Sequence, residues 1–245
     1  MESKSSKVYS LSLLEQAELD VFLEENLHTR RIWPFKFPIA ASIFFIKKKN
    51  GLLWLVQDYR TLNTITVKNR YPFPLISELI SQLCRAKYFT KLDVHWDFNN
   101  IYIKSEDKWK VAFYTNHSLF EPFVMFFGMT NSPATFQTMI NNIFRTLIAE
   151  GIVVVYLNDI LIFTKTKEEH ERMVWRVLEI LAEHKLFLYP EKYEFYWRQI
   201  KYLGLVISEN KVAIDPVKVA RVCEWPIPEN QTDMQAFIGF VNFYR

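Results

Sequence analysis

The stretch that decides the fold is Ile152-Val153-Val154-Val155-Tyr156-Leu157-Asn158-Asp159-Ile160-Leu161-Ile162-Phe163. Two apolar runs rich in β-branched residues flank one polar pair, which predicts two strands joined by a tight turn at Asn158-Asp159. Asn and Asp both tolerate the positive φ angles of such turns, so ordinary turn chemistry explains the pair. A carboxylate between two buried strands is costly unless a cation meets it, so a metal site at the hairpin tip is the alternative interpretation.

The composition is that of a folded protein. The chain has 245 residues, 50% of them hydrophobic, which is enough for one large domain or two modest ones. The net charge of +3 permits a nucleic-acid partner without requiring one. Cys84 and Cys223 lack metal-ligand spacing and indicate a reducing compartment. No signal peptide follows Met1, and residues 152–163 are too short to span a bilayer, so we expect a soluble protein.

Helices and short strands alternate along the chain, which predicts an α+β fold around an antiparallel sheet. The predicted helices cover 12–28, 75–84, 132–150 and 167–184, with two shorter ones starting at Asp215-Pro216 and at Thr232. The predicted strands cover 42–46, 52–58, 88–94, 101–104, 109–113 and 200–207. Ser12 with Glu15 forms a capping box, and Ser132 reads as an N-cap before Pro133. The last helix still runs at Arg245, which favours a chain that continues.

Several segments, taken in order, resemble the motifs of reverse transcriptases, most closely those of Gypsy-type long-terminal-repeat retrotransposons. The segments are Val56 to Asn63, Phe89-Thr90-Lys91-Leu92-Asp93, Phe126 to Gln137, Val155 to Leu161, Tyr202-Leu203-Gly204 and Phe237 to Arg245. The resemblance covers the chain from about residue 20. It implies a right-hand polymerase fold with fingers (about 20–85 and 97–140), palm (about 86–96 and 141–207) and the beginning of a thumb or connection (about 208–245).

The resemblance also implies a two-metal catalytic site. Asp93 and Asp159 would hold two Mg²⁺ ions, with Mn²⁺ as a substitute and the Val94 backbone as a further ligand. Two such ions, about 3.5–4 Å apart, stabilise charge on the attacking and leaving oxygens of phosphoryl transfer. The position of the family's remaining catalytic acid is Asn158. An amide is isosteric with a carboxylate but neutral, so the hairpin should form while polymerase activity is impaired.

Other site residues are carried over from the resemblance, each with an alternative. Lys48 and Lys49, in the basic turn 47–51, would contact a triphosphate or simply be solvated. Phe98 would gate the sugar 2′ position, and Phe127 would stack beside the nucleotide or pack in the core. Gln137 would reach the template or lie on a solvated helix face. The segment Tyr202-Leu203-Gly204 would be a primer-grip hairpin or a plain edge strand. The five histidines show no ligand spacing and are expected to be incidental.

Four positions depart from the family pattern: Trp54 for Arg, Asp97 for a small residue, Ser118 for Gly and Asn158 for Asp. A single C→T or G→A transition can produce each change, which suggests a degenerate transposon copy. The implied function is RNA-directed DNA polymerisation with dNTPs on a primed RNA or DNA template. The alternative is a catalytically inactive, nucleic-acid-binding remnant. The family arrangement implies fusion to protease, ribonuclease H and integrase domains, no membrane partner, and a cytoplasmic virus-like particle or the nucleus as location.

Overall fold

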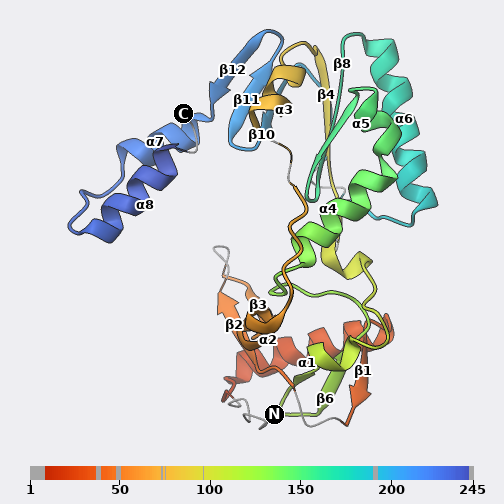
Figure 1. The fold of residues 1–245 in the computed structure, drawn as a ribbon, viewed down its shortest axis with the longest axis vertical. Helices are drawn as coiled ribbons and strands as arrows, with labels where there is room; N and C mark the ends of the chain where they lie inside the picture. Colours follow the sequence, from red (N-terminus) through yellow and green to blue (C-terminus); the bar gives the residue numbers. More distant parts are fainter. Residues whose placement is uncertain are drawn as a thin grey trace. The chain divides into compact units, whose positions relative to one another are not determined.

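The computed structural model describes residues 9–36, 40–47, 51–72, 74, 76–95, 97–189 and 193–242. The chain divides into two compact units (Figure 1). Unit 1 comprises Met1–Phe73 and Val94–Ile143, and unit 2 comprises Pro74–Asp93 and Phe144–Arg245. Helices combine with antiparallel sheets in both, which confirms the predicted α+β fold. The finer division into fingers, palm and thumb stays a prediction.

Unit 1 packs helix α1 against short antiparallel strands. Its elements are α1 (Leu13–His28), β1 (Ile32–Phe35), β2 (Ile43–Lys47), β3 (Leu53–Gln57), α2 (Arg60–Ile65), η1 (Asp97–Asn100), η2 (Lys108–Val111), β5 (Phe113–Tyr114), β6 (Leu119–Pro122) and α4 (Ser132–Ile143). The strands form the sheet β1-β6-β5 and the hairpin β2-β3. The predicted capping box of Ser12 and Glu15 is confirmed at the start of α1. Leu19 and Leu23 then bury one face of α1 against Phe113 and Phe126.

Unit 2 is built on the four-stranded antiparallel sheet β7-β8-β4-β9. Its elements are α3 (Ile76–Leu83), β4 (Tyr88–Asp93), α5 (Arg145–Ala149), β7 (Val153–Tyr156), β8 (Asp159–Thr164), α6 (Lys167–Glu183), β9 (Glu194–Trp197), β10 (Gln199–Tyr202), β11 (Leu205–Ser208), β12 (Lys211–Ile214), α7 (Pro216–Cys223) and α8 (Gln231–Asn242). Side chains alternate across the sheet. On one face, Phe89, Leu161 and Phe163 share a core with α3 and the β10–β11 hairpin. On the other face, Thr90 and Thr164 contact His170 of α6.

Two predicted strands and one predicted helix in unit 1 differ from the structure. Residues 101–104 contribute only an isolated bridge between Tyr102 and Val124. Residues 109–113 form the end of η2 and the start of β5, because Lys110 N–H bonds to the Asp107 carbonyl at 3.0 Å and closes a turn. Ser132 does not cap α4, since its buried hydroxyl donates to the Phe126 carbonyl at 3.3 Å.

Three further corrections concern the rest of the chain. The predicted helix 132–150 breaks at Phe144, which leaves helical geometry (φ −97°, ψ 14°) with its side chain fully buried. The predicted strand 200–207 is the hairpin β10–β11, because Leu203 and Gly204 both adopt positive φ. The last helix begins at Gln231 rather than at Thr232, and the Asn230 side chain accepts the Asp233 N–H at 2.9 Å. Across the described ranges, we find no helix with the length and apolarity needed to cross a membrane.

Candidate active site

The predicted central hairpin is confirmed, but its turn lies one residue earlier than predicted. Tyr156 pairs with Asp159, so the two loop residues are Leu157 and Asn158, and Asp159 is the first residue of β8. Leu157, not Asn or Asp, carries the positive φ angle of 54°. For a residue with a β-carbon this left-handed conformation costs about 1–2 kcal/mol. The turn therefore stores strain directly beside the polar pair.

Asp93 and Asp159 lie directly opposite each other on β4 and β8. In an antiparallel pair, opposite residues point to the same face with their β-carbons about 4.5–5.5 Å apart, and two like charges there are destabilising. Asp93 is 9% exposed, which raises the cost of holding its charge. The site therefore requires a cation.

Lys91 supplies one cation at this site. It lies two residues before Asp93 on β4 and so on the same face, and its Nζ is 2.9 Å from Asp159 Oδ1. The side chains of both partners are about a quarter exposed. Lys91 was not among the predicted site residues, although the two-residue period of the strand places it beside Asp93. Lys91 and the two carboxylates leave a net charge of −1.

Tyr202 joins this face from the end of β10. Its side chain is 1% exposed, and burial, reinforced by nearby Asp159 and Tyr156, raises the pKa of its hydroxyl. The hydroxyl has no hydrogen-bond partner among the residues that the structure describes. Leu203 and Gly204 form the turn after it, so a hairpin, rather than the alternative of a plain edge strand, is observed. Its role as a primer grip stays a prediction.

In unit 1 the predicted gate and the predicted stacking residue touch. The rings of Phe98 and Phe127 lie 4.8 Å apart edge to face, and Trp54 lies 4.8 Å from Phe127 on a second side. Phe98 is buried and Phe127 is half-buried. Trp54, one of the departures from the family pattern, is thus part of this aromatic cluster. These contacts agree with the core-packing alternative for Phe127, and a nucleotide contact stays a prediction.

Gln137 is fully buried on α4, so the alternative of a solvated helix face is wrong. Its Nε2 donates to Asn141 Oδ1 at 2.9 Å, and Asn141 donates in turn to the Tyr71 hydroxyl at 2.9 Å. Asn63, which was not among the predicted site residues, donates to the Gly128 carbonyl at 2.7 Å and accepts the Thr130 N–H at 2.9 Å. The two hydrogen bonds of Asn63 fix the loop at Gly128 and Thr130, directly before α4. A template contact by Gln137 remains a prediction.

Some predicted site residues are not tested by the geometry. Lys48, Lys49 and the side chain of Asp97 lie outside the described part of the chain. Val94 is fully buried after β4, and the role of its backbone stays a prediction. Among the residues described, no group of three or more His, Cys, Asp or Glu side chains could hold a metal ion. This agrees with Asn158 in place of an acid.

The back face of the unit 2 sheet holds a fully hydrogen-bonded histidine. Thr164 Oγ1 donates to the Thr166 carbonyl, so it accepts from His170 Nδ1–H at 3.0 Å. Because Nδ1 carries the proton of the neutral ring, Nε2 accepts from Thr90 Oγ1 at 2.7 Å, and Thr90 Oγ1 in turn accepts the Tyr196 N–H. His170 is fully buried, and burial lowers its pKa to about 4. The expectation that the histidines are incidental is wrong for His170.

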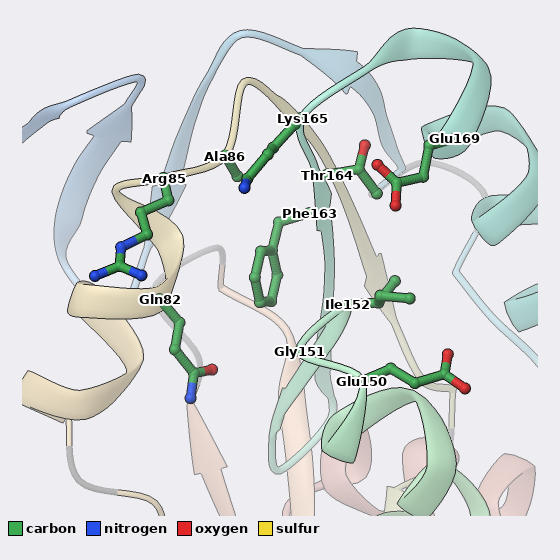
Figure 2. A pocket seen from close by; sticks show the side chains of 10 residues that line it. All are labelled: Gln82, Arg85, Ala86, Glu150, Gly151, Ile152, Phe163, Thr164, Lys165 and Glu169. Carbon is green, nitrogen blue, oxygen red and sulfur yellow. The ribbon is translucent and has the colours of Figure 1, made fainter.

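A pocket of about 380 Å³ in unit 2 lies away from the paired aspartates. It is lined by Gln82, Arg85, Ala86, Glu150, Gly151, Ile152, Phe163, Thr164, Lys165 and Glu169. In Figure 2 the ring of Phe163 lies between Gln82 on one side and Glu169 on the other. The pocket adjoins Thr164, the opposite end of β8 from Asp159. It is therefore separate from the candidate active site.

Comparison with known proteins identifies the family. Residues 46–207, more than half of the chain, match the family described as "Reverse transcriptase (RNA-dependent DNA polymerase)". The chain belongs to the reverse transcriptase family. The resemblance stated from the motifs is thereby confirmed, whereas the finer assignment to the Gypsy type stays a prediction.

The similar curated proteins of this reverse transcriptase chain are transposon polyproteins. The chain is 33% identical over 245 residues to the retrovirus-related Pol polyprotein from transposon 297 of Drosophila melanogaster, covering 98% of the chain and 23% of that protein. It is 36% identical over 206 residues to the transposon Tf2-3 polyprotein of Schizosaccharomyces pombe (strain 972 / ATCC 24843), covering 84% of the chain and 15% of that protein. The chain thus spans less than a quarter of the length of these two relatives.

Solved structures support the fold of the reverse transcriptase chain. The foamy viral protease-reverse transcriptase dRH in complex with double-stranded DNA superposes with a TM-score of 0.89 at 20% identity, covering 100% of this chain and 43% of that one. The foamy viral protease-reverse transcriptase in complex with an RNA/DNA hybrid superposes with a TM-score of 0.84 at 19% identity, covering 99% of this chain and 32% of that one. At this identity the likeness establishes the fold alone. Members of the reverse transcriptase family normally use divalent metals, and metal binding by Asp93 and Asp159 stays a prediction.

Proposed function

We propose that this chain is the polymerase part of a Gypsy-type retrotransposon polyprotein, and that it adds dNTPs to a primer on an RNA or DNA template at a rate limited by Asn158. One observation carries the proposal. Asp93 and Asp159 face each other across adjacent strands, with Asn158 in the turn immediately before Asp159. The opposed carboxylates are oxygen donors of the kind that Mg²⁺ prefers.

The residues present fit one divalent ion better than two. Asp93 and Asp159 would hold Mg²⁺ or Mn²⁺, with the Val94 backbone as a further oxygen donor. When bound, two such ions stabilise charge on the attacking and leaving oxygens of phosphoryl transfer. Asn158 adds a single neutral oxygen, and the ammonium of Lys91 already contacts Asp159 at 2.9 Å. Both features weaken binding of a second dication.

The remaining residues would bind and orient the substrates. Phe98 and Phe127 would bound the nucleotide, Lys48 and Lys49 would contact its phosphates, and Gln137 would support the template side. The hairpin at Leu203-Gly204 would hold the primer. The DNA and RNA/DNA complexes of the foamy viral enzymes support a primed nucleic-acid duplex as the substrate. Because such binding is largely electrostatic, it should weaken steeply with salt. Other domains of the polyprotein would supply protease, ribonuclease H and integrase activities.

A second candidate function is a nucleic-acid-binding domain without turnover. Asn158 and the ion pair between Lys91 and Asp159 favour it, because both reduce the negative charge available to metal ions. Binding of primer–template would then be independent of divalent metal, and no extension would follow.

Primer extension by the matched pair of wild type and Asn158→Asp tests the proposal. Replacing even an outer-shell partner of a metal ligand changes affinity or activity by about 10–100-fold, so restoring a ligand should raise the extension rate at least tenfold. Asn142→Asp, the same chemical change at an exposed position on α4, is the control and should leave the rate unchanged. Equal, near-normal extension by wild type and Asn158→Asp would refute the proposed limitation. Metal-independent binding by both, without extension, would support the second candidate.

A further inference from the structure

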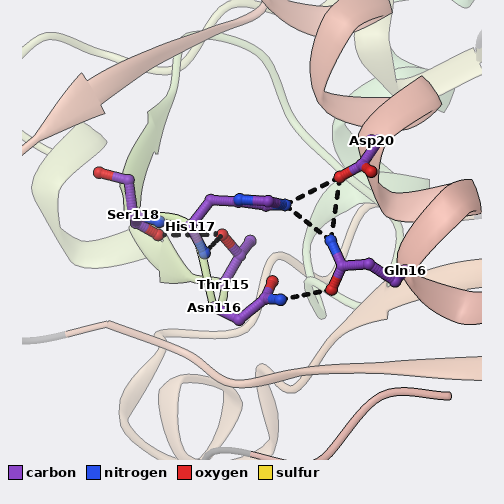
Figure 3. Close-up of polar contacts among 6 residues, drawn as sticks. All are labelled: Gln16, Asp20, Thr115, Asn116, His117 and Ser118. Atoms are coloured by element: carbon purple, nitrogen blue, oxygen red, sulfur yellow. Dashed lines mark hydrogen bonds and ion pairs between the residues drawn. The ribbon is translucent and has the colours of Figure 1, made fainter. Parts of the chain in front are cut away.

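In unit 1, helix α1 meets the turn between β5 and β6 at a cluster of polar side chains (Figure 3). Gln16 Nε2 lies 2.9 Å from Asp20 Oδ1 and 2.7 Å from His117 Nε2. His117 Nε2 lies 2.8 Å from the same Asp20 oxygen. The Asn116 amide contacts the other end of the Gln16 amide. Three heteroatoms from two distant segments therefore form a triangle with nearly equal sides.

Both segments hold their side chains firmly. Thr115 N–H donates to the Ser118 carbonyl at 2.9 Å, and Thr115 Oγ1 accepts the N–H groups of His117 at 3.1 Å and Ser118 at 3.2 Å. This turn presents His117 to the helix. Gln16 and Asp20 are four residues apart on α1 and so share one face. The buried Leu19 fixes that helix on the core.

Protons alone cannot satisfy this triangle while Asp20 is a carboxylate. If His117 Nε2 carries a proton, it can donate to Asp20 but then opposes the donating amide of Gln16. If Nε2 carries none, it accepts from Gln16 but opposes the lone pairs of Asp20 at 2.8 Å. If the Gln16 amide is turned over, His117 is satisfied but Gln16 Oε1 opposes the Asp20 oxygen at 2.9 Å. Each arrangement leaves one side of the triangle repulsive.

We propose that Gln16, Asp20 and His117 bind a divalent transition-metal ion such as Ni²⁺, Co²⁺ or Zn²⁺. With the Gln16 amide turned over, an amide oxygen, a carboxylate oxygen and an imidazole nitrogen lie within 2.9 Å of one another, close enough to share one ion. The Asn116 amide turns with it and accepts from Gln16 Nε2. Imidazole favours these metals over Mg²⁺ and Ca²⁺, which prefer oxygen alone.

The spacing of the three donors fits one face of an octahedron. With metal–ligand bonds of about 2.0–2.2 Å, neighbouring ligands lie about 2.8–3.1 Å apart at right angles and about 3.3–3.6 Å apart in a tetrahedron. The observed separations of 2.8 and 2.9 Å lie in the octahedral range and that of 2.7 Å lies just below it, whereas all three are shorter than a tetrahedral site requires. The side chains of His117 and Asp20 are 48% and 56% exposed, so water fills the other positions. The pair four residues apart on a helix is also the spacing of the two histidines in helical zinc motifs.

The bound ion joins α1 to the β5–β6 turn. The proposed metal site lies in unit 1, whereas the paired aspartates Asp93 and Asp159 belong to unit 2, and the two sites share no residue. The proposal is thus independent of polymerase activity.

Nickel titration of the full chain, followed by the imidazole resonances in NMR, tests the site. A large excess of Mg²⁺ keeps the paired aspartates occupied. We expect His117 to broaden at lower Ni²⁺ concentration than His28, an exposed histidine in the last turn of α1. Loss of a ligand should weaken binding by about 10–100-fold.

Two variants separate a metal site from a hydrogen-bonded tether. Asp20→Asn keeps hydrogen bonding at an exposed position but removes the anionic ligand, and His117→Gln removes the imidazole. Both should weaken Ni²⁺ binding measured by calorimetry at least about tenfold, whereas His28→Gln should leave it unchanged. Simultaneous broadening of His117 and His28, or equal Ni²⁺ affinity of wild type and Asp20→Asn, would overturn the proposal.

Discussion

Acidification should destabilise unit 2 through His170. The neutral imidazole uses Nδ1–H as a donor to Thr164 and Nε2 as an acceptor from Thr90. A second proton would turn Nε2 into a donor, so the Thr90 hydroxyl proton would lose its acceptor on His170. This bonding pattern agrees with burial in lowering the pKa of His170 from 6.5 to about 4.

The direction and the size of the effect follow from proton linkage. Because the folded-state pKa is below the unfolded one, the unfolded chain binds more protons between pH 6.5 and about pH 4. The contribution to stability is full above pH 6.5 and is lost as the pH falls toward 4. With these two pKa values, the free energy of unfolding should fall by about 2 kcal/mol between pH 7 and pH 5 from His170 alone.

The assay compares how steeply the free energy of unfolding changes with pH in each protein, rather than the free energy itself. Urea unfolding at several pH values, followed by hydrogen exchange of α6 amides, would be measured for wild type, His170→Gln and His184→Gln. His170→Gln should lose about 2 kcal/mol of the pH dependence, while His184→Gln, exposed at the end of α6, should retain it. The reasoning is refuted if wild type and His170→Gln have the same slope, or if NMR titration gives His170 a pKa of 6 or more.

Three other substitutions test the packing and the active-site hairpin. Leu157→Gly should raise the free energy of unfolding by about 0.5–1 kcal/mol, because glycine adopts the positive φ of the turn without strain; a fall in urea unfolding would contradict this. Phe113→Ala should lower the free energy of unfolding of unit 1 by about 3–5 kcal/mol, since the buried ring contacts three other phenylalanines. Unchanged hydrogen exchange of the α1 amides would argue against this. Lys91→Met should tighten Mg²⁺ binding up to about fivefold, because the partly exposed ion pair with Asp159, which is worth about 1 kcal/mol, no longer has to be broken when the metal binds. Weaker Mg²⁺ binding by the variant in calorimetry would count against this.

The fold was largely predictable because its main elements have strong local signals. The capping box of Ser12 and the apolar runs around Asn158 each specify one conformation over a short window. Residues 101–104 and 109–113 are rich in aromatic and β-branched side chains typical of strands, but the first forms only an isolated bridge and the second begins in a turn closed by the Asp107 carbonyl. Phe144 shows the same limit, because the helix breaks at this fully buried residue without a neighbouring glycine or proline to predict it.

The positions of Asp93 and Asp159 at strand ends could be predicted, whereas the residues that contact them could not. Strand periodicity and the turn place Asp93 and Asp159 at strand ends, and only the register of β4 against β8 makes them partners. The contact between His117 and Asp20 joins residues 97 positions apart, and no local pattern indicates it. Asn63 is similar, since its bonds to Gly128 and Thr130 depend on how two loops of unit 1 meet.

The folded hairpin is not by itself an argument for activity. Its stability comes from buried side chains such as Val154 and Leu161, which are indifferent to the charge at position 158. An aspartate there would add a third carboxylate directly before Asp159, which Lys91 already contacts, and further cations would be needed to offset its charge. With Asn158 the excess negative charge falls from −2 to −1. We therefore expect a chain with Asn158 to need one dication fewer at this site than a chain with aspartate there, while the buried apolar side chains keep the hairpin folded.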